Sequence, residues 1–533
     1  MWNYGNAACE YSEYSVCKDT PIAIAADVSH KRGNSYFRIS HTDINNGINK
    51  LKPSIGMDGI HANHLKFCPD SYRFLISELF SSFSRHEYVP NSLIKGSISP
   101  TVKDKFGNLR SSDNYRPVMS SSVFFKLLEY CILPKISPYI AINDRQHGFR
   151  GNYSTTTACF VLKETILNYF SSRSDVHGCF IDISKAFDSV NHEILMKKLL
   201  ASGIPNHYVM FLKYIYNNQF VNVRYKSCIS QEWRVNSGVR QGGVLSGLLF
   251  SIYINDMVNG VSNMKEGCRI GIHSSNIIAY ADDIVLLAPS RKGLQILVDK
   301  AFEESQYLNL NFNGNKSKYM IFRYSRAKVI SSSNIYIGTS KLEKVEMIKY
   351  LGFNINEFLS NYDDICRARN KFYSDFNNLI RKFYFASTDV KLFLFKNFCC
   401  QFYGCDLWFY NKGSNFALRQ FAVGYHKAVK KILGLSTHES NHFACQEATL
   451  LTFEHLLNKI KILSALRFLN SPCRFVEKIL YFFNISSVMF IEVRDLFSEK
   501  YEAETIFEQD RDAIMSRLQF VQNHEERMRE GWD

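Results

Sequence analysis

The sequence predicts a mixed α+β fold, and three stretches of the chain carry this prediction. Residues 276–290, NIIAYADDIVLLAPS, place two short apolar runs around an acidic pair, a pattern typical of a β-hairpin with a polar turn. Residues 178–188, GCFIDISKAFD, hold another apolar run that ends in an aspartate and continues into a helix expected near Lys185. From about residue 361 the pattern changes to helices rich in basic and aromatic residues.

Three aspartates in the first two stretches are candidate metal ligands: Asp182, Asp282 and Asp283. Mg²⁺ binds through one or two carboxylates and completes its shell with water and substrate phosphates. Two such ions about 3.5–4 Å apart can hold the attacking and leaving oxygens of a phosphoryl transfer. We therefore expect the end of the first strand to lie beside the hairpin tip. The alternative is that the acidic pair is simply a polar turn.

Composition indicates a globular protein with a polyanionic partner. The chain has 533 residues, too many for one ordinary core, so we expect two or more domains. Lys and Arg number 64 against 50 acidic residues, and the formal charge of +14 favours nucleic acid as a partner. No apolar run approaches the length of about 18 residues that crossing a bilayer requires, so no membrane partner is expected.

The 14 cysteines are scattered, without a CxxC pair or a Cys/His array of zinc spacing. The first residues, MWNYGNAACE, lack the basic and apolar segments of a secretory signal. These observations predict reduced, mostly buried thiols and a protein of the cytoplasm and nucleus.

Three blocks in this order resemble the palm of a reverse transcriptase: FIDISKAFDSVNHEIL, SGVRQGGVLSGLLFSIYINDM and YADDIVLLA. They are most similar to the enzymes of non-LTR (LINE-type) retrotransposons, and the similarity runs from about Ile48 to Ile355. The resemblance implies a right-hand polymerase fold with fingers, palm and thumb. The implied segments are an N-terminal extension with a pre-fingers segment (1–95), fingers (96–175), palm (176–358, completing a core that begins at 96), thumb (359–440) and a helical C-terminal region (441–533).

The fingers block, residues 97–133, reads as a strand ending in a Gly turn, a second strand and an amphipathic helix over about 123–133. In the resembling enzymes a Lys and an Arg of this region lie over the triphosphate of the incoming nucleotide. The matching residues here are Lys103 and Arg116. A guanidinium suits this contact because its planar fork pairs with phosphate through two donors. A solvated surface Arg is the alternative.

Gln146, Arg150 and Ser154 belong to a QxGF…ST block that opens a helix over about 158–170. The resemblance implies that this block contacts the template backbone. A plain helix with a hydroxyl-rich cap is the alternative.

Phe187 and Gln241 are the nucleotide contacts that the resemblance implies for the palm. The family's aromatic residue at this offset lies beneath the sugar and excludes a ribose 2′-OH, so Phe187 predicts DNA synthesis; a core Phe is the alternative. The family's Gln helps to position the dNTP, and glycines around Gln241 allow close approach. After Ser246 the family usually has Pro, whereas this chain has Gly247, which loosens the next helix by about 1 kcal/mol or less.

Lys316 matches a family Lys that lies near the triphosphate, where a cation would stabilise departing pyrophosphate or donate a proton. Lys318 is the second candidate for this position. The basic amphipathic helices after about residue 361 occupy the position of the thumb and would follow the duplex backbone. Solvated faces on a helical core are the alternative for those helices.

The sequence therefore predicts an RNA-directed DNA polymerase that serves retrotransposition of a non-LTR element. The expected partners are an RNA template, a DNA primer or target DNA, and dNTPs, and the expected cofactor is two Mg²⁺ ions, with Mn²⁺ as a substitute. The alternative function is a catalytically inactive nucleic-acid-binding remnant of such an element. Gly247 and the absence of a recognisable endonuclease domain or Cys/His knuckle in the sequence keep that alternative open.

Overall fold

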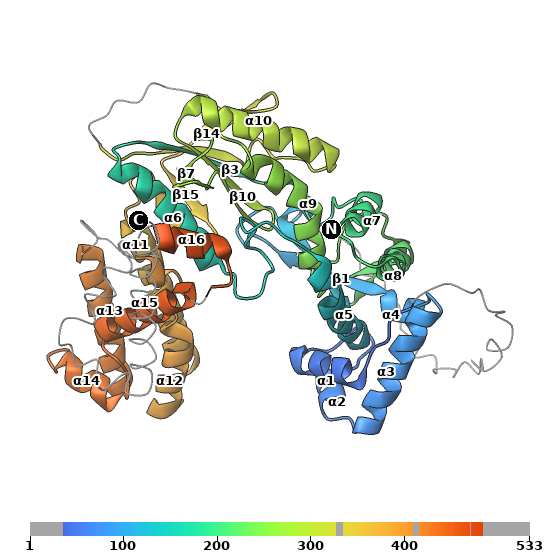
Figure 1. Ribbon diagram of the computed structural model, residues 1–533. Helices are drawn as coiled ribbons and strands as arrows, with labels where there is room; N and C mark the ends of the chain where they lie inside the picture. The colour runs from blue at the N-terminus through green and yellow to red at the C-terminus, as the bar shows by residue number, and fades with distance from the viewer. Residues whose placement is uncertain (1–35, 327–333, 409–414, 470, 483–533) are drawn as a thin grey trace, which may run out of the picture.

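The computed structural model describes residues 36–326, 334–408, 415–469 and 471–482. These residues form an arch in which a central sheet and its helices lie between two groups of helices (Figure 1). The mixture of sheets and helices confirms the predicted α+β class, and its three-part arrangement is that of the right-hand fold. Parts of the predicted N-terminal and C-terminal segments, residues 1–35 and 483–533, lie outside the described residues.

The central sheet has the strand order β14-β11-β3-β10-β9. β3 (Val176–Ile181) pairs antiparallel with β10 (Asp283–Ala288), and β10 pairs with β9 (Ile277–Tyr280), which confirms the predicted hairpin. β11 (Lys318–Phe322) lies on the other side of β3 and pairs with β14 (Glu343–Lys344). Mostly buried, apolar side chains fill β3, β9, β10 and β11, because the sheet is covered on both faces there, whereas the two residues of β14 are exposed.

Alternate side chains of β10 enter two separate cores. Ile284 joins the core that contains α9 (Ser246–Ser262) and α10 (Arg291–Tyr307). Val285 joins the core that contains α6 (Thr155–Ser171). This period of two is the geometry of an extended strand, and it fixes the direction in which the residues at the strand end point.

A second sheet, of order β2-β1-β4-β5 with β6 paired to β4, lies toward the N-terminal helices. β1 (Gly96–Val102) pairs antiparallel with β2 (Tyr115–Ser121) and parallel with β4 (Phe220–Tyr225). β5 (Cys228–Ile229) and β6 (Trp233–Arg234) extend it from β4. One strand from the residue range predicted as palm, β4, thus pairs with the predicted fingers strand β1, and it carries β5 and β6 on its other pairings.

Two groups of helices form the ends of the arch. The N-terminal group comprises α1 (His41–Lys50), α2 (Ala62–Lys66), α3 (Asp70–Arg85), α4 (Asn91–Ile94) and α5 (Val123–Ile136). The C-terminal group comprises α11 (Tyr362–Lys382), α12 (Thr388–Leu394), α13 (Asn415–Leu433), α14 (Asn441–Glu447) and α15 (Phe453–Leu469). It has a core of its own, to which α11 contributes a buried stripe at helical spacing: Ile365, Ala368, Phe372, Phe376 and Leu379. After this group, α16 (Arg474–Phe482) packs against α6.

Smaller elements complete the described chain. The hairpin of β15 (Met347–Tyr350) and β16 (Phe353–Asn356) leads from the central sheet into α11. The remaining elements are α7 (His192–Ala201), α8 (Asn206–Asn217) and the strand pairs β7 (Arg269–Ile270) with β8 (His273–Ser274) and β12 (Tyr336–Ile337) with β13 (Ser340–Lys341).

The prediction of a helix that begins near Lys185 is wrong. Residues 184–189 form turns, and Lys185 has a left-handed backbone with φ of 48°. The helix begins only at His192, because the Asn191 side chain caps it by accepting hydrogen bonds from the N–H groups of Glu193 and Ile194. Phe187 consequently lies in a turn.

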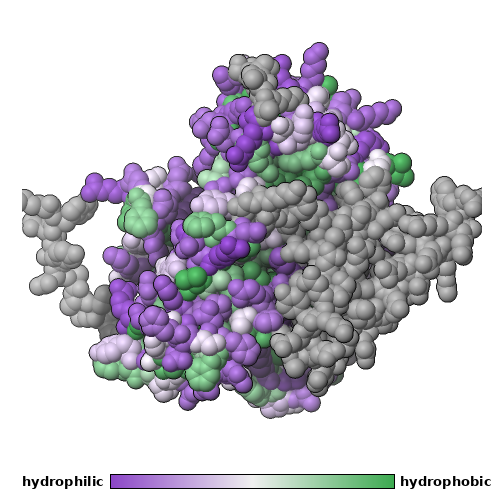
Figure 2. Space-filling model, turned by 90° about the vertical axis from the view of Figure 1, so that its left-hand side faces the viewer, coloured by the Kyte–Doolittle hydropathy of each residue, from purple (hydrophilic) through white to green (hydrophobic). Residues whose placement is uncertain are grey.

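None of the described helices combines the length and the apolar character that a bilayer-spanning helix requires. The described residues visible in Figure 2 are mainly hydrophilic, with small hydrophobic patches between them.

Candidate active site

The central sheet brings the three candidate aspartates to one of its ends. Ile181 of β3 pairs with Ile284 of β10, so the next residue outward on each strand is an aspartate, Asp182 or Asp283. Asp282 lies in the turn between β9 and β10, after Ala281, whose φ is 56°. The sheet register therefore places residues about a hundred positions apart in the sequence beside one another.

Gln146 holds the hairpin turn. Its Oε1 accepts hydrogen bonds from the N–H of Ala281 (2.9 Å) and the N–H of Gly148 (2.8 Å). The backbone beside it pairs with β9, because the His147 N–H donates to the Ala279 carbonyl (2.7 Å). The Gln146 side chain has no exposed surface, so in place of the predicted template contact it has a supporting role in the turn.

Burial and neighbouring like charges raise the pKa values of the hairpin carboxyls. Partial desolvation, followed by the charges of Asp282 and Asp182, raises the pKa of Asp283 to about 6. Burial raises the pKa of Asp282 and the charge of Asp182 adds to this, whereas its own backbone N–H and Arg116 oppose the rise. A cation placed among these groups would relieve their repulsion.

The donor chemistry at the hairpin fits a hard divalent ion. Within the described residues, no three His, Cys, Asp or Glu side chains already form a group able to hold a metal. Mg²⁺ does not require such a group, because one or two carboxylates suffice when water and substrate phosphates supply the other ligands. The oxygen-only set of Asp182, Asp282 and Asp283 therefore suits Mg²⁺ arriving with a nucleotide.

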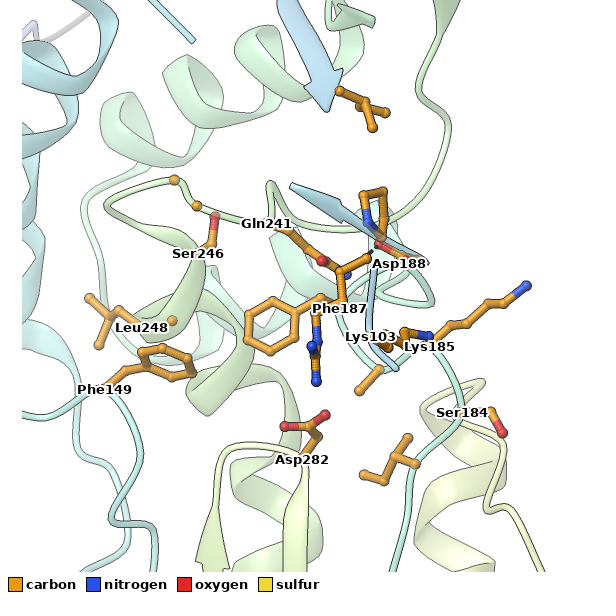
Figure 3. Close-up of a pocket in the computed structure, with 18 of the residues that line it drawn as sticks. Lys103, Phe149, Ser184, Lys185, Phe187, Asp188, Gln241, Ser246, Leu248 and Asp282 are labelled. Atoms are coloured by element: carbon orange, nitrogen blue, oxygen red, sulfur yellow. Dashed lines mark hydrogen bonds between the residues drawn. The ribbon is translucent and has the colours of Figure 1, made fainter. Parts of the chain in front are cut away.

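A cavity of about 2100 Å³ opens beside the aspartates. It gathers most of the predicted site residues on its walls: Lys103, Arg116, Arg150, Asp182, Phe187, Gln241, Asp282 and Lys316. Figure 3 shows the carboxyl group of Asp282 directed from the hairpin toward the ring of Phe187. Acidic residues thus lie at one end of a space that also presents basic and aromatic side chains, as a nucleoside triphosphate requires.

The loop that carries Gln241 is anchored by two residues that the sequence prediction missed. Glu129 of α5, which is buried, accepts a hydrogen bond from the Val244 N–H (3.0 Å). Arg240 lies over the ring of Phe125, at 3.9 Å from its centroid, and donates to the Ile94 carbonyl (2.9 Å). No local pattern could have identified these partners, because Glu129 lies 115 residues before Val244.

Asp188 is a further missed contact of the cavity. Its Oδ1 accepts a hydrogen bond from Gln241 Nε2 at 3.2 Å (Figure 3). Burial raises the pKa of Asp188, and this hydrogen bond opposes the rise. The contact orients the amide of Gln241 at the cavity wall.

The segment before β11 supports Asp182 and presents Lys316. The Asp182 carbonyl accepts from the Asn313 N–H (2.8 Å), and the Asp182 N–H donates to Ser317 Oγ (3.0 Å). Lys316 lines the cavity, whereas the Lys318 ammonium donates to Glu343 at 2.6 Å. This geometry favours Lys316 over Lys318 as the cation near a bound triphosphate.

Arg150 and Ser154 have structural partners next to the cavity. The Arg150 guanidinium lies over the Tyr153 ring and donates to the Asn143 carbonyl and to Asp144. The exposed Ser154 caps α6, with its Oγ accepting from the Thr157 N–H at 3.1 Å. The hydroxyl cap was the alternative interpretation of Ser154, and a contact with a template stays a prediction for both residues.

Comparison with known proteins identifies this region. The family model described as reverse transcriptase (RNA-dependent DNA polymerase) matches residues 103–355. The chain is 26% identical over 339 residues to the Pol polyprotein of type-2 retrotransposable element R2DM from Drosophila melanogaster, covering 61% of this chain and 31% of that protein. It is 27% identical over 339 residues to the RNA-directed DNA polymerase of mobile element jockey from Drosophila funebris, covering 61% and 36%.

The chain therefore spans well under half of the length of either relative. Among solved structures, a telomerase from Candida albicans in complex with a fragment of telomeric RNA aligns with 81% of this chain and 68% of its own, at 10% identity and a TM-score of 0.38. Residues 103–355, which contain the aspartates and most of the residues that line the cavity, match the reverse transcriptase family model and are similar to the proteins of non-LTR retrotransposons.

Proposed function

We propose that the chain is an RNA-directed DNA polymerase that copies an RNA template into DNA for the retrotransposition of a non-LTR element. The observation that carries the proposal is the convergence of Asp182, Asp282 and Asp283 at one end of the central sheet, beside a cavity with basic and aromatic walls. Acidic ligands next to cationic side chains are the arrangement that phosphoryl transfer from a nucleoside triphosphate requires.

Reverse transcriptases as a family generally use divalent metal ions. In this chain Asp182, Asp282 and Asp283 would hold two Mg²⁺ ions, or Mn²⁺ in their place. When bound, the ions would supply a lowered pKa at the primer 3′-hydroxyl and charge neutralisation at the triphosphate.

The remaining residues bind and orient the reactants. Lys103 and Arg116 bind the triphosphate of the incoming nucleotide, and Lys316 stabilises or protonates the departing pyrophosphate. Phe187 lies beneath the sugar and excludes a 2′-hydroxyl, while Gln241, held by Asp188, positions the nucleotide. Most of the acceleration comes from this positioning and charge stabilisation.

The partners are an RNA template, a DNA primer or target DNA, and dNTPs, met in the cytoplasm and nucleus. Arg150 and Ser154, beside the cavity, contact the template backbone. The basic helices of the C-terminal group, together with the net charge of +14, favour binding of the duplex backbone.

Primer extension on an RNA template, with and without Mg²⁺, tests the proposal. The wild-type chain should incorporate dNTPs only with the metal, and Asp282→Asn should abolish incorporation while leaving the thermal unfolding transition in place. Asp299→Asn is the matched control, since Asp299 is an exposed residue of α10 that does not line the cavity. Extension retained by Asp282→Asn would refute the assignment, and RNA binding without extension by the wild type would favour the inactive remnant.

A further inference from the structure

Phe149 presents an aromatic ring to the cavity at a position that neither the motifs nor the comparisons assign to the nucleotide. The side chain is 57% exposed and lines the cavity close to Leu248 (Figure 3). An exposed ring on a cavity wall is available to a ligand, whereas most phenylalanines of a folded protein are buried.

The backbone fixes Phe149 at this place. Its φ is 57°, in the left-handed region that a bulky residue rarely adopts. The preceding residue, Gly148, lies so close to the hairpin that a Cβ there would be 2.5 Å from the Ala281 nitrogen. The strained conformation persists because the surrounding structure determines it, and such strain is typical of functional sites.

Gly247 is the residue that makes room for the ring. A Cβ added to Gly247 would lie 2.6 Å from both the Cβ and the Cδ1 of Phe149, well inside van der Waals contact. These are atoms near the root of the Phe149 side chain, so the clash could not be relieved by a small rotation of its far end. The Pro that the family usually has after the Ser cannot occupy this position with Phe149 as it stands.

Phe149 in turn supports Phe187. The Phe187 ring stacks on the buried Phe250 of α9, with centroids 4.8 Å apart and an interplanar angle of 16°. On another side, the Phe149 ring meets Phe187 edge to face, with centroids 5.7 Å apart and an angle of 82°. Phe187 therefore has a fixed stacking partner in the core and a second one in the cavity wall.

We propose that Gly247 and Phe149 are a sterically matched pair of positioning residues that hold Phe187 for discrimination between deoxyribose and ribose. The proposal rests on the proposed function and adds to it the residues that set sugar selectivity. The glycine in place of the usual Pro is then a partner of Phe149 and not a mark of decay. Loss of either member frees the Phe187 ring, which admits a 2′-hydroxyl more readily.

A double-mutant cycle on Phe149→Ala and Gly247→Ala tests the pair, with two readouts on the full chain. The first is the ratio of kcat/KM for dNTP and rNTP in Mg²⁺-dependent primer extension. Each single variant should lower this ratio about threefold to tenfold, the range expected for losing an aromatic pair. The double variant should match Phe149→Ala alone, and Phe187→Ala should give a larger loss.

The second readout is the thermal midpoint of the same variants. Gly247→Ala should lower it by overpacking. The same change should cost less in the Phe149→Ala background, because the close contacts with Cγ and Cδ1 of Phe149 are gone and only the contact with its Cβ remains. Gly260→Ala is the matched control, because Gly260 is on the same helix and its added Cβ would meet the flexible end of Glu304. It should leave the selectivity ratio at the wild-type value.

The proposal would be overturned if the effects of the two substitutions were additive. It would also be overturned if Gly247→Ala kept both the selectivity ratio and the thermal midpoint of the wild type. If the wild-type chain extends primers with neither nucleotide, the proposed function fails. The thermal cycle then decides the steric match by itself: non-additive midpoints support it and additive midpoints overturn it.

Discussion

Two regions of the molecule handle charge in opposite ways: the hairpin tip and the junction between α6 and α11. At the junction the buried carboxylate of Asp364 accepts hydrogen bonds from Arg367 Nε (2.7 Å), Trp408 Nε1 (2.8 Å) and the Asn354 N–H (2.9 Å). Three donors from separate parts of the chain stabilise this one negative charge.

A partly buried cation at the junction is stabilised in the same way. The Lys163 ammonium donates to Asn361 Oδ1 (2.8 Å) and to the Leu407 carbonyl (2.9 Å). Burial lowers its pKa, and the charge of Asp364 opposes that change. The charged groups of the junction are therefore matched by the fold itself.

At the hairpin tip burial raises the pKa values of Asp282 and Asp283, and the neighbouring charges, which are mainly alike, add to the rise. The difference indicates which charges serve the fold and which serve a ligand. A buried carboxylate that accepts hydrogen bonds from the chain stabilises the packing of the elements that supply the donors. A cluster of carboxylates that repel one another is instead typical of a site that binds a cation.

The largest effect is expected for Asp283→Asn. The change removes a candidate ligand, so Mg²⁺-dependent extension should fall about a thousandfold or more. The free energy of unfolding should stay the same or increase, because a like charge is removed from the tip. Single-turnover extension and urea unfolding measure the two effects. A large loss of stability would instead group Asp283 with the structural carboxylates of the junction.

Asp364→Ala should mainly lower stability, the reverse of the effect expected for Asp283→Asn. It leaves buried donors unpaired and should cost about 3 kcal/mol or more of unfolding free energy. The matched control is Asp375→Ala on the same helix, where an ion pair with the exposed Lys371 is worth about 0.5 kcal/mol or less. Equal losses from the two variants in urea unfolding would contradict the structural assignment of Asp364.

Glu164 of α6 sharpens the comparison, because it is a buried carboxylate away from the tip. Burial raises its pKa from the ordinary value of 4.5 to about 7, while Lys163 opposes the rise. Between these values the folded state binds more protons than the unfolded state, so stability should fall as the pH rises through this window. Above the window the penalty approaches about 3 kcal/mol.

Glu164→Gln should remove this pH dependence and stabilise the protein at pH values above the window. Urea unfolding across the window measures the slope. Glu303→Gln, at an exposed position of α10, should keep the wild-type slope. A wild-type slope in Glu164→Gln would show that other groups cause the pH dependence.

The smallest effect is expected for Asp188→Asn. The Asp188 carboxylate resembles neither the repelling carboxylates of the hairpin tip nor the fully hydrogen-bonded Asp364 of the junction. It lines the cavity, but the fold supplies it with a donor, Gln241. The substituted amide can still accept that hydrogen bond, so the KM for dNTP should rise by about tenfold or less. Asp188→Ala should raise it further. A loss as large as that of Asp283→Asn would make Asp188 part of the acidic cluster.

The sequence was sufficient for features that depend on local pattern. The hairpin at residues 277–288 and the apolar strand before Asp182 follow from runs of apolar residues, and the structure confirms them. The turn at Lys185 was missed because a left-handed residue leaves no signal in apolar periodicity. The site roles of the aspartates stay predictions, although the register supports their proximity.

Long-range hydrogen bonds were beyond prediction for a physical reason. Gln146 was assigned to the template because its QxGF…ST block resembles the template-contacting block of the family, but the tertiary fold uses its amide oxygen to accept the Ala281 N–H. Ser317 and Glu129 hold backbone groups that lie 135 and 115 residues away in the chain. Which of several polar side chains meets a buried N–H depends on packing, and composition does not encode that choice.

The pairing of the Gln146 backbone with Ala279 helps to fix the strand register of the hairpin. β9 is the outermost strand in the order of the central sheet, and a strand in that position can slide along its neighbour. A slip of one residue would turn every side chain of the strand to the opposite face. The additional backbone pairing with Gln146 opposes this shift in register, so the hairpin tip is preorganised before substrate binds.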